Sequence, residues 1–153
     1  MNRREWISGA VGTLGSLGVI GALEGSAFAE GKKKDAHVHG AGAANPYLKA
    51  IDAATDCAKK GEICIAHCQE MLASGDKSMA GCLKTALEMV AACNALVKLA
   101  SMQSKGTKKM AALCAELCRE CEKACKEHAE HHAVCKDCME SCNACAKECD
   151  KIA

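Results

Sequence analysis

The chain has 153 residues, which is long enough for one domain with a substantial core and short for two. It contains 14 cysteines but only one Trp, one Tyr and one Phe, so aromatic packing contributes almost nothing to that core. The 20 Lys and Arg nearly balance the 19 Asp and Glu, which excludes the basic surface of a nucleic-acid-binding protein and the basic amphipathic helix of a membrane-surface protein.

Residues 1–29 resemble a twin-arginine export signal. The pair Arg3 and Arg4 precedes a glycine-rich apolar run, and residues 27–29 read Ala-Phe-Ala, an A-x-A cleavage site. A transmembrane anchor is the alternative, but the run is short and glycines interrupt it. The sequence therefore predicts that the signal is removed and that the mature protein is periplasmic or otherwise outside the cytosol.

Residues 30–45 are polar and rich in glycine, which predicts a flexible leader before the fold. Within this leader, His37 and His39 can capture a metal ion, although a solvated segment is the simpler interpretation. Asn45 followed by Pro46 is typical of a helix N-terminus, and a first helix is expected to continue to about residue 73.

Breaks in the pattern divide the rest of the chain into three more helices. Ser-Gly-Asp at residues 74–76 separates the first helix from a second, expected over about 77–102. Gly106 ends that helix, and Thr107 is expected to cap a third that reaches about residue 129. A fourth helix is expected after a turn near residues 130–132.

Long helices with short connections predict an all-α fold, an antiparallel up-down-up-down four-helix bundle over residues 46–153. No strand pattern competes with this prediction. Because no Gly or Pro separates the third helix from the fourth, the alternative is one continuous helix over residues 108–152 in a three-helix arrangement.

The cysteines share one face of each predicted helix. At about 100° per residue, those of the fourth helix fall within an arc of roughly 80°, those of the third within roughly 60° and those of the first within about 40°. Charged residues such as Lys136 and Glu148 lie on the opposite side of the fourth helix. The inward-facing residues are Cys57, Cys64, Cys68, Cys82, Cys93, Cys114, Cys118, Cys121, Cys125, Cys135, Cys138, Cys142, Cys145 and Cys149.

Three interpretations of this core compete. Cysteine can act as a small hydrophobe, but the resulting core buries far less apolar area than leucine would. A disulfide scaffold fits an even cysteine count in an exported chain, yet same-face neighbours on one helix close only tiny loops. A metal core is favoured because cysteines at i, i+3 and i, i+4 place two thiolates within reach of one ion, and many such pairs overlap here.

Soft thiolates favour Cu(I), zinc and iron–sulfur clusters. Zinc prefers closed sets of four ligands, into which an unbroken ladder does not divide naturally, and no proline follows any cysteine as in a common iron–sulfur spacing. Cu(I) accepts two thiolates and tolerates bridging, which predicts on the order of ten to fifteen ions per chain. A zinc or cadmium thiolate sink and a disulfide-stapled helical interaction protein are the alternatives. No catalytic constellation separates from the stripe, so no enzyme is predicted.

The cysteine stripes CIAHC, CAELCRECEKAC and CKDCMESCNACAKEC, with the export signal and the four helical segments, resemble the bacterial copper storage proteins. The resemblance covers residues 46–152, and the exported branch of the family is the closer match. It implies that Cu(I) is stored by cysteine thiolates inside the bundle of a homotetramer and kept for a copper-requiring enzyme. Carried over to this sequence, the ligands would be all 14 cysteines.

One end of an antiparallel bundle is expected to gather thioether and imidazole side chains around the outermost cysteines. Such a mouth can pass copper inward, and the alternative is that the methionines fill gaps while the histidines lie in a solvated turn. The residues concerned are Met71, Met79, His128, His131 and His132, around Cys68, Cys82, Cys125 and Cys135.

The first two helices carry a second apolar strip, displaced from the cysteines. A surplus apolar face favours association between chains, so oligomerisation through these two helices is expected. The strip consists of Ile51, Ile65, Leu72, Leu83, Leu87, Val90 and Val97.

Overall fold

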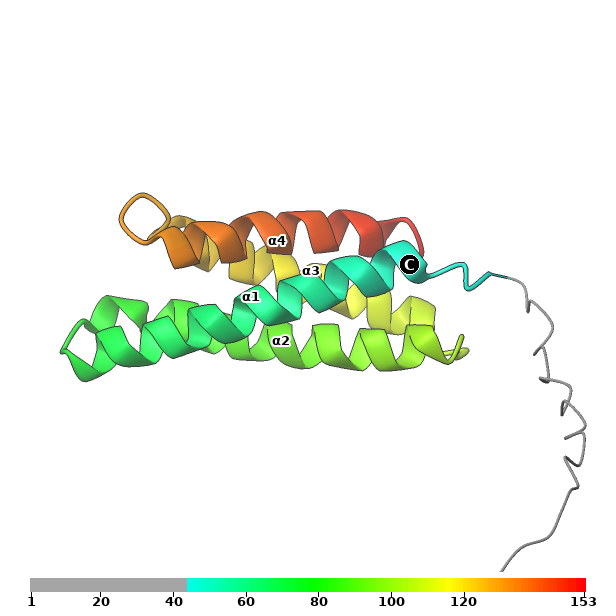
Figure 1. Cartoon of the computed structure of the whole chain (residues 1–153), viewed down its shortest axis with the longest axis horizontal. Helices are drawn as coiled ribbons and strands as arrows, with labels where there is room; N and C mark the ends of the chain where they lie inside the picture. Colours follow the sequence, from blue (N-terminus) through cyan, green and yellow to red (C-terminus); the bar gives the residue numbers. More distant parts are fainter. Residues whose placement is uncertain (1–43) are drawn as a thin grey trace, which may run out of the picture. The chain divides into compact units, whose positions relative to one another are not determined.

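The structure is a computed structural model that describes residues 44–153 and shows a bundle of four helices there (Figure 1). The helices are α1 (Leu48–Ala73), α2 (Ala80–Ser101), α3 (Thr107–Lys126) and α4 (Ala133–Asp150), and a short 3-10 turn, η1 (Lys77–Met79), precedes α2. The predicted four-helix bundle is confirmed. The alternative of one helix over 108–152 is wrong, because α3 ends at Lys126. The predicted signal and nearly all of the leader lie outside the described residues.

The helices form a ring in which α1 and α3 each pack against both α2 and α4. The sulfur pairs define the direction of neighbouring helices. Cys82, near the start of α2, lies 3.4 Å from Cys125 near the end of α3, whereas Cys93, further along α2, lies 3.6 Å from Cys114, earlier in α3. Neighbouring helices in this pair therefore run in opposite directions, as their short connection requires.

The connection between α1 and α2 turns where the sequence breaks. Gly75 has a φ of +99°, a left-handed conformation that glycine adopts without steric cost. The side chain of Asp76 then accepts a hydrogen bond of 3.0 Å from the backbone N–H of Ser78 and caps η1. The chain therefore reverses within a few residues of the end of α1.

Two polar side chains tie the opposite end of the bundle together. Thr107 was expected to cap α3, but this prediction is wrong: the residue is already helical, and its buried hydroxyl donates to the carbonyl of Leu99 at 3.1 Å. Asn45 accepts the backbone N–H of Tyr47 at 2.9 Å and donates its amide N–H to the carbonyl of Ala100 at 2.9 Å. The beginnings of α1 and α3 are therefore both fastened to the end of α2.

The buried core is made of sulfur and small side chains in α3 and α4. Apart from their cysteines, these two helices bury only alanines, Thr107 and Ser141. The larger buried side chains come from α1, η1 and α2, among them Met79, Met89 and Leu96, each with none of its surface exposed. The four helices thus contribute unequally to the packing.

The second apolar strip is mostly used within the chain. Ile65 and Val90 are buried, and only Leu87 among the seven residues is exposed, with half of its surface accessible. The remaining four, Ile51, Leu72, Leu83 and Val97, are partly buried against the core. The sequence overestimated the surplus apolar surface, because the residues between the cysteine face and the solvent face pack where adjacent helices meet.

Among the described residues, the segment Lys77–Ser101 is long and apolar enough to cross a membrane by length and composition alone, with a mean hydropathy of 1.3. Its buried side chains, including Cys93 and Leu96, line the bundle core. A core position accounts for the apolar character of this segment, and length and hydropathy by themselves do not distinguish a core helix from a membrane span.

Candidate metal centre

All 14 cysteines are free thiols, and each has at most 1% of its surface exposed. Contacting Sγ atoms lie between 3.4 Å, for Cys82 and Cys125, and 4.0 Å, for Cys64 and Cys68. Metal–thiolate bonds of about 2.3 Å place two sulfurs on one ion roughly 3.7 to 4.6 Å apart, depending on the angle between them. The thiols are therefore spaced almost as they would be around metal ions, across helices as well as along them.

Groups of three or four thiols whose sulfurs all lie within 4.8 Å of one another follow the bundle axis. Several cysteines belong to two groups, as Cys64, Cys138 and Cys145 do. Cys68 belongs to none of them but lies 4.0 Å from Cys64. The groups are Cys57, Cys93, Cys118 and Cys145; Cys64, Cys82 and Cys135; Cys64, Cys125 and Cys138; Cys114, Cys145 and Cys149; and Cys121, Cys138 and Cys142.

One group departs from the expectation that the ladder contains no set of four ligands. Cys57, Cys93, Cys118 and Cys145 come from the four different helices and converge within 4.8 Å. Four thiolates at this spacing suit a tetrahedral ion such as zinc. However, Cys145 also belongs to the group with Cys114 and Cys149, so the set is not closed and its sulfurs remain available for bridging.

Burial controls the protonation of the thiols near the α1–α2 turn. Loss of water raises the pKa of Cys68 and of Cys135 above the ordinary value of 9.0, because the thiolate form loses more solvation than the neutral thiol. By contrast, hydrogen bonds, first from Cys125 and then from Cys138, lower the pKa of Cys121. Thiols with a raised pKa are neutral at pH 7, so an ion that binds them must displace protons.

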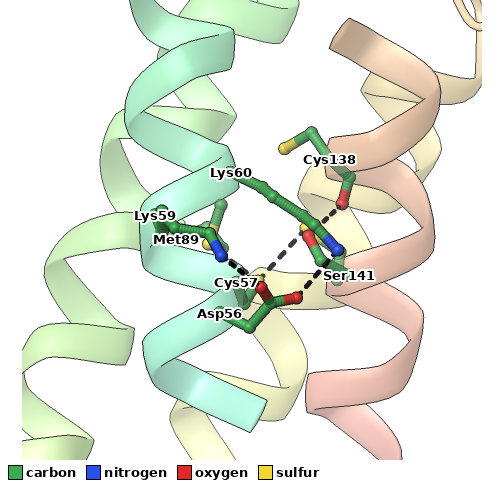
Figure 2. Close-up of polar contacts among 8 residues, drawn as sticks. Asp56, Cys57, Lys59, Lys60, Met89, Cys138 and Ser141 are labelled. Atoms are coloured by element: carbon green, nitrogen blue, oxygen red, sulfur yellow. Dashed lines mark hydrogen bonds and ion pairs between the residues drawn. The ribbon is translucent and has the colours of Figure 1, made fainter. Parts of the chain in front are cut away.

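The inward and outward faces of α1 carry different chemistry, as Figure 2 shows. On the outside, Asp56 pairs with Lys59 at 3.0 Å and with Lys60 at 2.8 Å. Hydrogen bonds from Lys60 and then from Lys59 lower the pKa of the Asp56 carboxyl. The next residue, Cys57, is fully buried among the sulfurs of the core. The charged side chains therefore lie on the surface, and the buried face of α1 carries thiols and apolar side chains.

The end of the bundle near the α1–α2 turn gathers imidazoles, partly as expected. The Nε2 atom of His67 lies 2.9 Å from Nδ1 of His132, and the ring centroids of His128 and His132 are 6.4 Å apart. His131 is exposed instead. Met79 is fully buried, whereas Met71 is only partly buried against the core.

Sequence reasoning missed two residues of this sulfur and imidazole system. His67 was not included, although it directly precedes Cys68 and therefore had to lie at the same end of α1. Met89 was not included as a ligand either, yet its Sδ atom lies 3.3 Å from the Sγ of Cys57. The signal for Met89 was its place on the cysteine face of α2, four positions before Cys93.

Comparison with known proteins agrees with this geometry. The family model for copper storage proteins matches residues 43–153. The Cu(I)-bound copper storage protein BsCsp3 is 31% identical, with a TM-score of 0.65 over 70% of this chain and 98% of that one. Apo-Csp3 from Bacillus subtilis is also 31% identical, with a TM-score of 0.61 over 69% of this chain and 97% of that one. No curated protein sequence matches.

The family match includes every helix of the bundle and all 14 cysteines. The solved structures that resemble the chain are matched over almost their whole length. This chain belongs to the copper storage protein family.

Proposed function

We propose that this chain stores Cu(I) inside the bundle, with the thiolates of all 14 cysteines as ligands and a capacity of about one ion per cysteine. The observation that carries the proposal is the overlap of the thiol groups along the bundle axis, in which single cysteines belong to two groups. A bridging thiolate serves two ions, so a continuous network holds many more ions than isolated sites would.

The donor set favours Cu(I) over zinc or cadmium. Four of the five groups contain three thiols, too few to close a tetrahedral site with sulfur alone. Cu(I) is satisfied by two or three soft ligands. The group around Cys57 and Cys145 is where a tetrahedral ion would compete, so zinc belongs in the test as a competitor.

The proposed role is storage without turnover. No cysteine has more than 1% of its surface exposed, so no thiol faces a substrate in the described part of the chain. A surface hollow of about 540 Å³ is lined by Ala129, Glu130, His131, Ala133, Lys136 and Met139. None of these residues is within the thiol network.

We also propose that copper enters at the end where the α1–α2 turn meets the α3–α4 turn. His67 and His132 are in contact there, and Cys68 begins the thiol network directly beside His67. Imidazole and thioether groups bind copper more weakly than thiolates do and need no buried thiolate to start the transfer. Replacing His67 and His132 by Ala should slow copper uptake while leaving the final capacity unchanged, as stopped-flow mixing with Cu(I) would report.

Export and processing remain proposals drawn from the N-terminal sequence. The pair Arg3 and Arg4 and the cleavage site at residues 27–29 support the twin-arginine route, removal of residues 1–29 and a bundle domain that begins near residue 46. The mass of the protein recovered from outside the cytosol tests the cleavage site. Changing both arginines to lysine should abolish export; export that continued unchanged would rule out this route.

Stored copper is proposed to supply a copper-requiring enzyme, from a homo-oligomer that the family resemblance makes a tetramer. Leu48, Ile63 and Leu87, each about half exposed on α1 or α2, supply apolar surface for association. Sedimentation of the copper-loaded protein tests the assembly, and a monomer would reject it. Transfer of bound Cu(I) to an apo-cuproenzyme in the absence of free copper tests the supply.

The deciding experiment is an anaerobic titration of the reduced chain with Cu(I) against a chelator of known affinity. Saturation is expected on the order of ten to fifteen ions per chain. Saturation at one or two ions would reject storage, and a free-thiol count well below 14 in the unreduced protein would favour the disulfide-stapled alternative. A parallel titration with zinc should saturate far earlier.

A matched variant removes the thiols of α4 alone, by changing Cys135, Cys138, Cys142, Cys145 and Cys149 to Ala. Capacity should fall by about five ions, one per thiol removed. Circular dichroism of the copper-loaded variant checks that the helices persist. Undiminished capacity in a folded variant would show that these cysteines are not ligands.

A further inference from the structure

A methionine sulfur lies among the thiols at the centre of the bundle. The Sδ atom of Met89 lies 3.3 Å from the Sγ of Cys57 (Figure 2). It also lies 3.6 Å from the Sγ of Cys93. The Met89 side chain has none of its surface exposed. Cys57 and Cys93 belong to the group that also contains Cys118 and Cys145, so the thioether is a fifth sulfur beside that group.

Met89 fills a gap in the thiols of α2. This helix has only Cys82 and Cys93, eleven positions and therefore roughly 16 Å apart along the axis. Cysteines in α3 and α4 follow one another every three or four residues instead. Met89 precedes Cys93 by four residues, the spacing that the pairs in the other helices use. It therefore occupies a position that a cysteine takes in α3 and α4.

The position is kept open by a glycine in the facing helix. A Cβ atom at Gly61, in the middle of α1, would lie 2.6 Å from the Cε of Met89 and 2.5 Å from the Cγ2 of Val90. Glycine in a helix interior costs about 1 kcal/mol relative to alanine. The helix thus carries a locally unfavourable residue where the methionine side chain needs its space.

We propose that Met89 is a Cu(I) ligand and forms a mixed thioether–thiolate site with Cys57 and Cys93, a proposal that depends on the Cu(I) storage function above. The three sulfurs form a triangle with two sides of 3.3 and 3.6 Å and a third within 4.8 Å, which a single three-coordinate ion fits after a small expansion. Thioether sulfur is a soft donor and suits Cu(I).

A neutral donor has a physical advantage at this depth. A third thiolate would add a negative charge in a region removed from water, where uncompensated charge is costly. The thioether completes the coordination without that charge and without releasing a proton. Copper at this site is therefore less dependent on pH than copper held by thiolates alone.

The test uses silver(I), which has the charge and closed d shell of Cu(I) and an isotope with a nuclear spin of one half. In the fully loaded chain, scalar coupling between silver and the methionine methyl protons requires a bond from sulfur to the metal. A correlation is expected for Met89, assigned by its loss in Met89→Leu. No correlation is expected for Met139, which is partly buried, lines the surface hollow beside Lys136 and is assigned by Met139→Leu.

The same variants are then loaded with Cu(I). Met89→Leu should hold about one ion fewer against the chelator, whereas Met139→Leu should match the unchanged protein. Leucine and methionine have similar volumes, so the fold should persist, and the silver measurement on the unchanged chain does not depend on any variant. A fully loaded chain without a Met89 correlation overturns this proposal alone. A chain that takes up only one or two ions overturns the storage function itself.

Discussion

The two halves of the bundle, α1 with α2 and α3 with α4, fill their inward positions differently. The first half buries Ile65, Met89, Val90 and Leu96 beside five cysteines. The second half has nine cysteines and no buried leucine, isoleucine, valine or methionine in the described chain. Sulfur and alanine bury less apolar area than branched side chains do. One half therefore supplies most of the hydrocarbon packing and the other most of the proposed metal ligands.

This division shows how a bundle can be a container and still fold before it is filled. A core made of thiols alone would be weakly stabilised without metal, and a core made of hydrocarbon would have no capacity. With α1 and α2 as the better-packed pair, α3 and α4 can depend on bound ions for part of their stability, because any ion that binds only the folded state stabilises it.

Copper loading should therefore stabilise the second half more than the first, and this is the largest effect expected. Binding with free copper a thousandfold above the dissociation constant adds about 4 kcal/mol per site. Hydrogen exchange followed by mass spectrometry should show amides of α4 exchanging faster than those of α2 in the metal-free protein and gaining more protection on loading. An equal gain in both helices would remove the distinction between the halves.

Single substitutions should separate packing from capacity. Leu96 is fully buried, so Leu96→Ala leaves a cavity in the first half of the bundle. This should cost about 2 to 5 kcal/mol in the free energy of unfolding of the metal-free protein, with little loss of copper capacity. Cys145→Ala removes only the buried Sγ atom. It should lower the free energy of unfolding by only about 1 kcal/mol, while the protein loses at least one bound ion. Urea unfolding and Cu(I) titration of both variants measure the two effects. The comparison fails if Leu96→Ala is the milder change in unfolding.

Alkaline pH should weaken the metal-free bundle through its thiols. Burial raises the pKa of Cys135 above the ordinary value of 9.0 that the unfolded chain retains. Below pH 9.0 the Cys135 thiol is protonated in both the folded and the unfolded state, so its full contribution to stability is present. Above pH 9.0 the unfolded chain releases this proton first. The free energy of unfolding therefore falls as the pH rises from 9.0 toward the folded pKa. The slope is at most about 1.4 kcal/mol per pH unit for each such thiol.

Urea unfolding of the reduced, metal-free protein on either side of pH 9.0 measures this slope. Cys135→Ala should have a shallower slope than the unchanged chain, and the copper-loaded protein should be nearly insensitive, because its thiolates have already lost their protons. A metal-free bundle whose stability does not change up to strongly alkaline pH would show that its thiols titrate as they do in the unfolded chain.

The helices and the inward direction of every cysteine could be predicted from the sequence because both follow from helical periodicity. Cys138 and Cys142, for example, share a face whatever the rest of the chain does. The ends of α1 and α2 could also be predicted from nearby residues. Gly75 adopts a positive φ just after α1, and Gly106 follows α2 and directly precedes the first residue of α3.

The arrangement across helices could not be predicted in the same way. A helical wheel gives the direction of a side chain but not the distance to the next helix, so the convergence of Cys57 with Cys118 and the contact of Met89 with Cys57 were not visible. For the same reason Thr107 was expected to cap its own helix, although its hydroxyl bonds to the end of α2. The close approach of α1 and α2 also buried Val90 and reduced the expected outer strip.

The smallest predicted effect tests that close approach, by placing a methyl group on two helical glycines. In Gly61→Ala the gain of about 1 kcal/mol in helix propensity competes with an overlap that leaves only 2.5 Å to the Cγ2 of Val90. Relieving such overpacking typically costs about 1 to 3 kcal/mol, so the net change should be neutral or destabilising.

In Gly81→Ala, near the start of α2, the new methyl group meets no atom within 4 Å and the gain should appear alone, up to about 1 kcal/mol. Thermal unfolding of the metal-free proteins gives both signs. If both variants are stabilised equally, Gly61 does not lie in close contact with Met89 and Val90. The first half would then not be the better-packed half of the bundle.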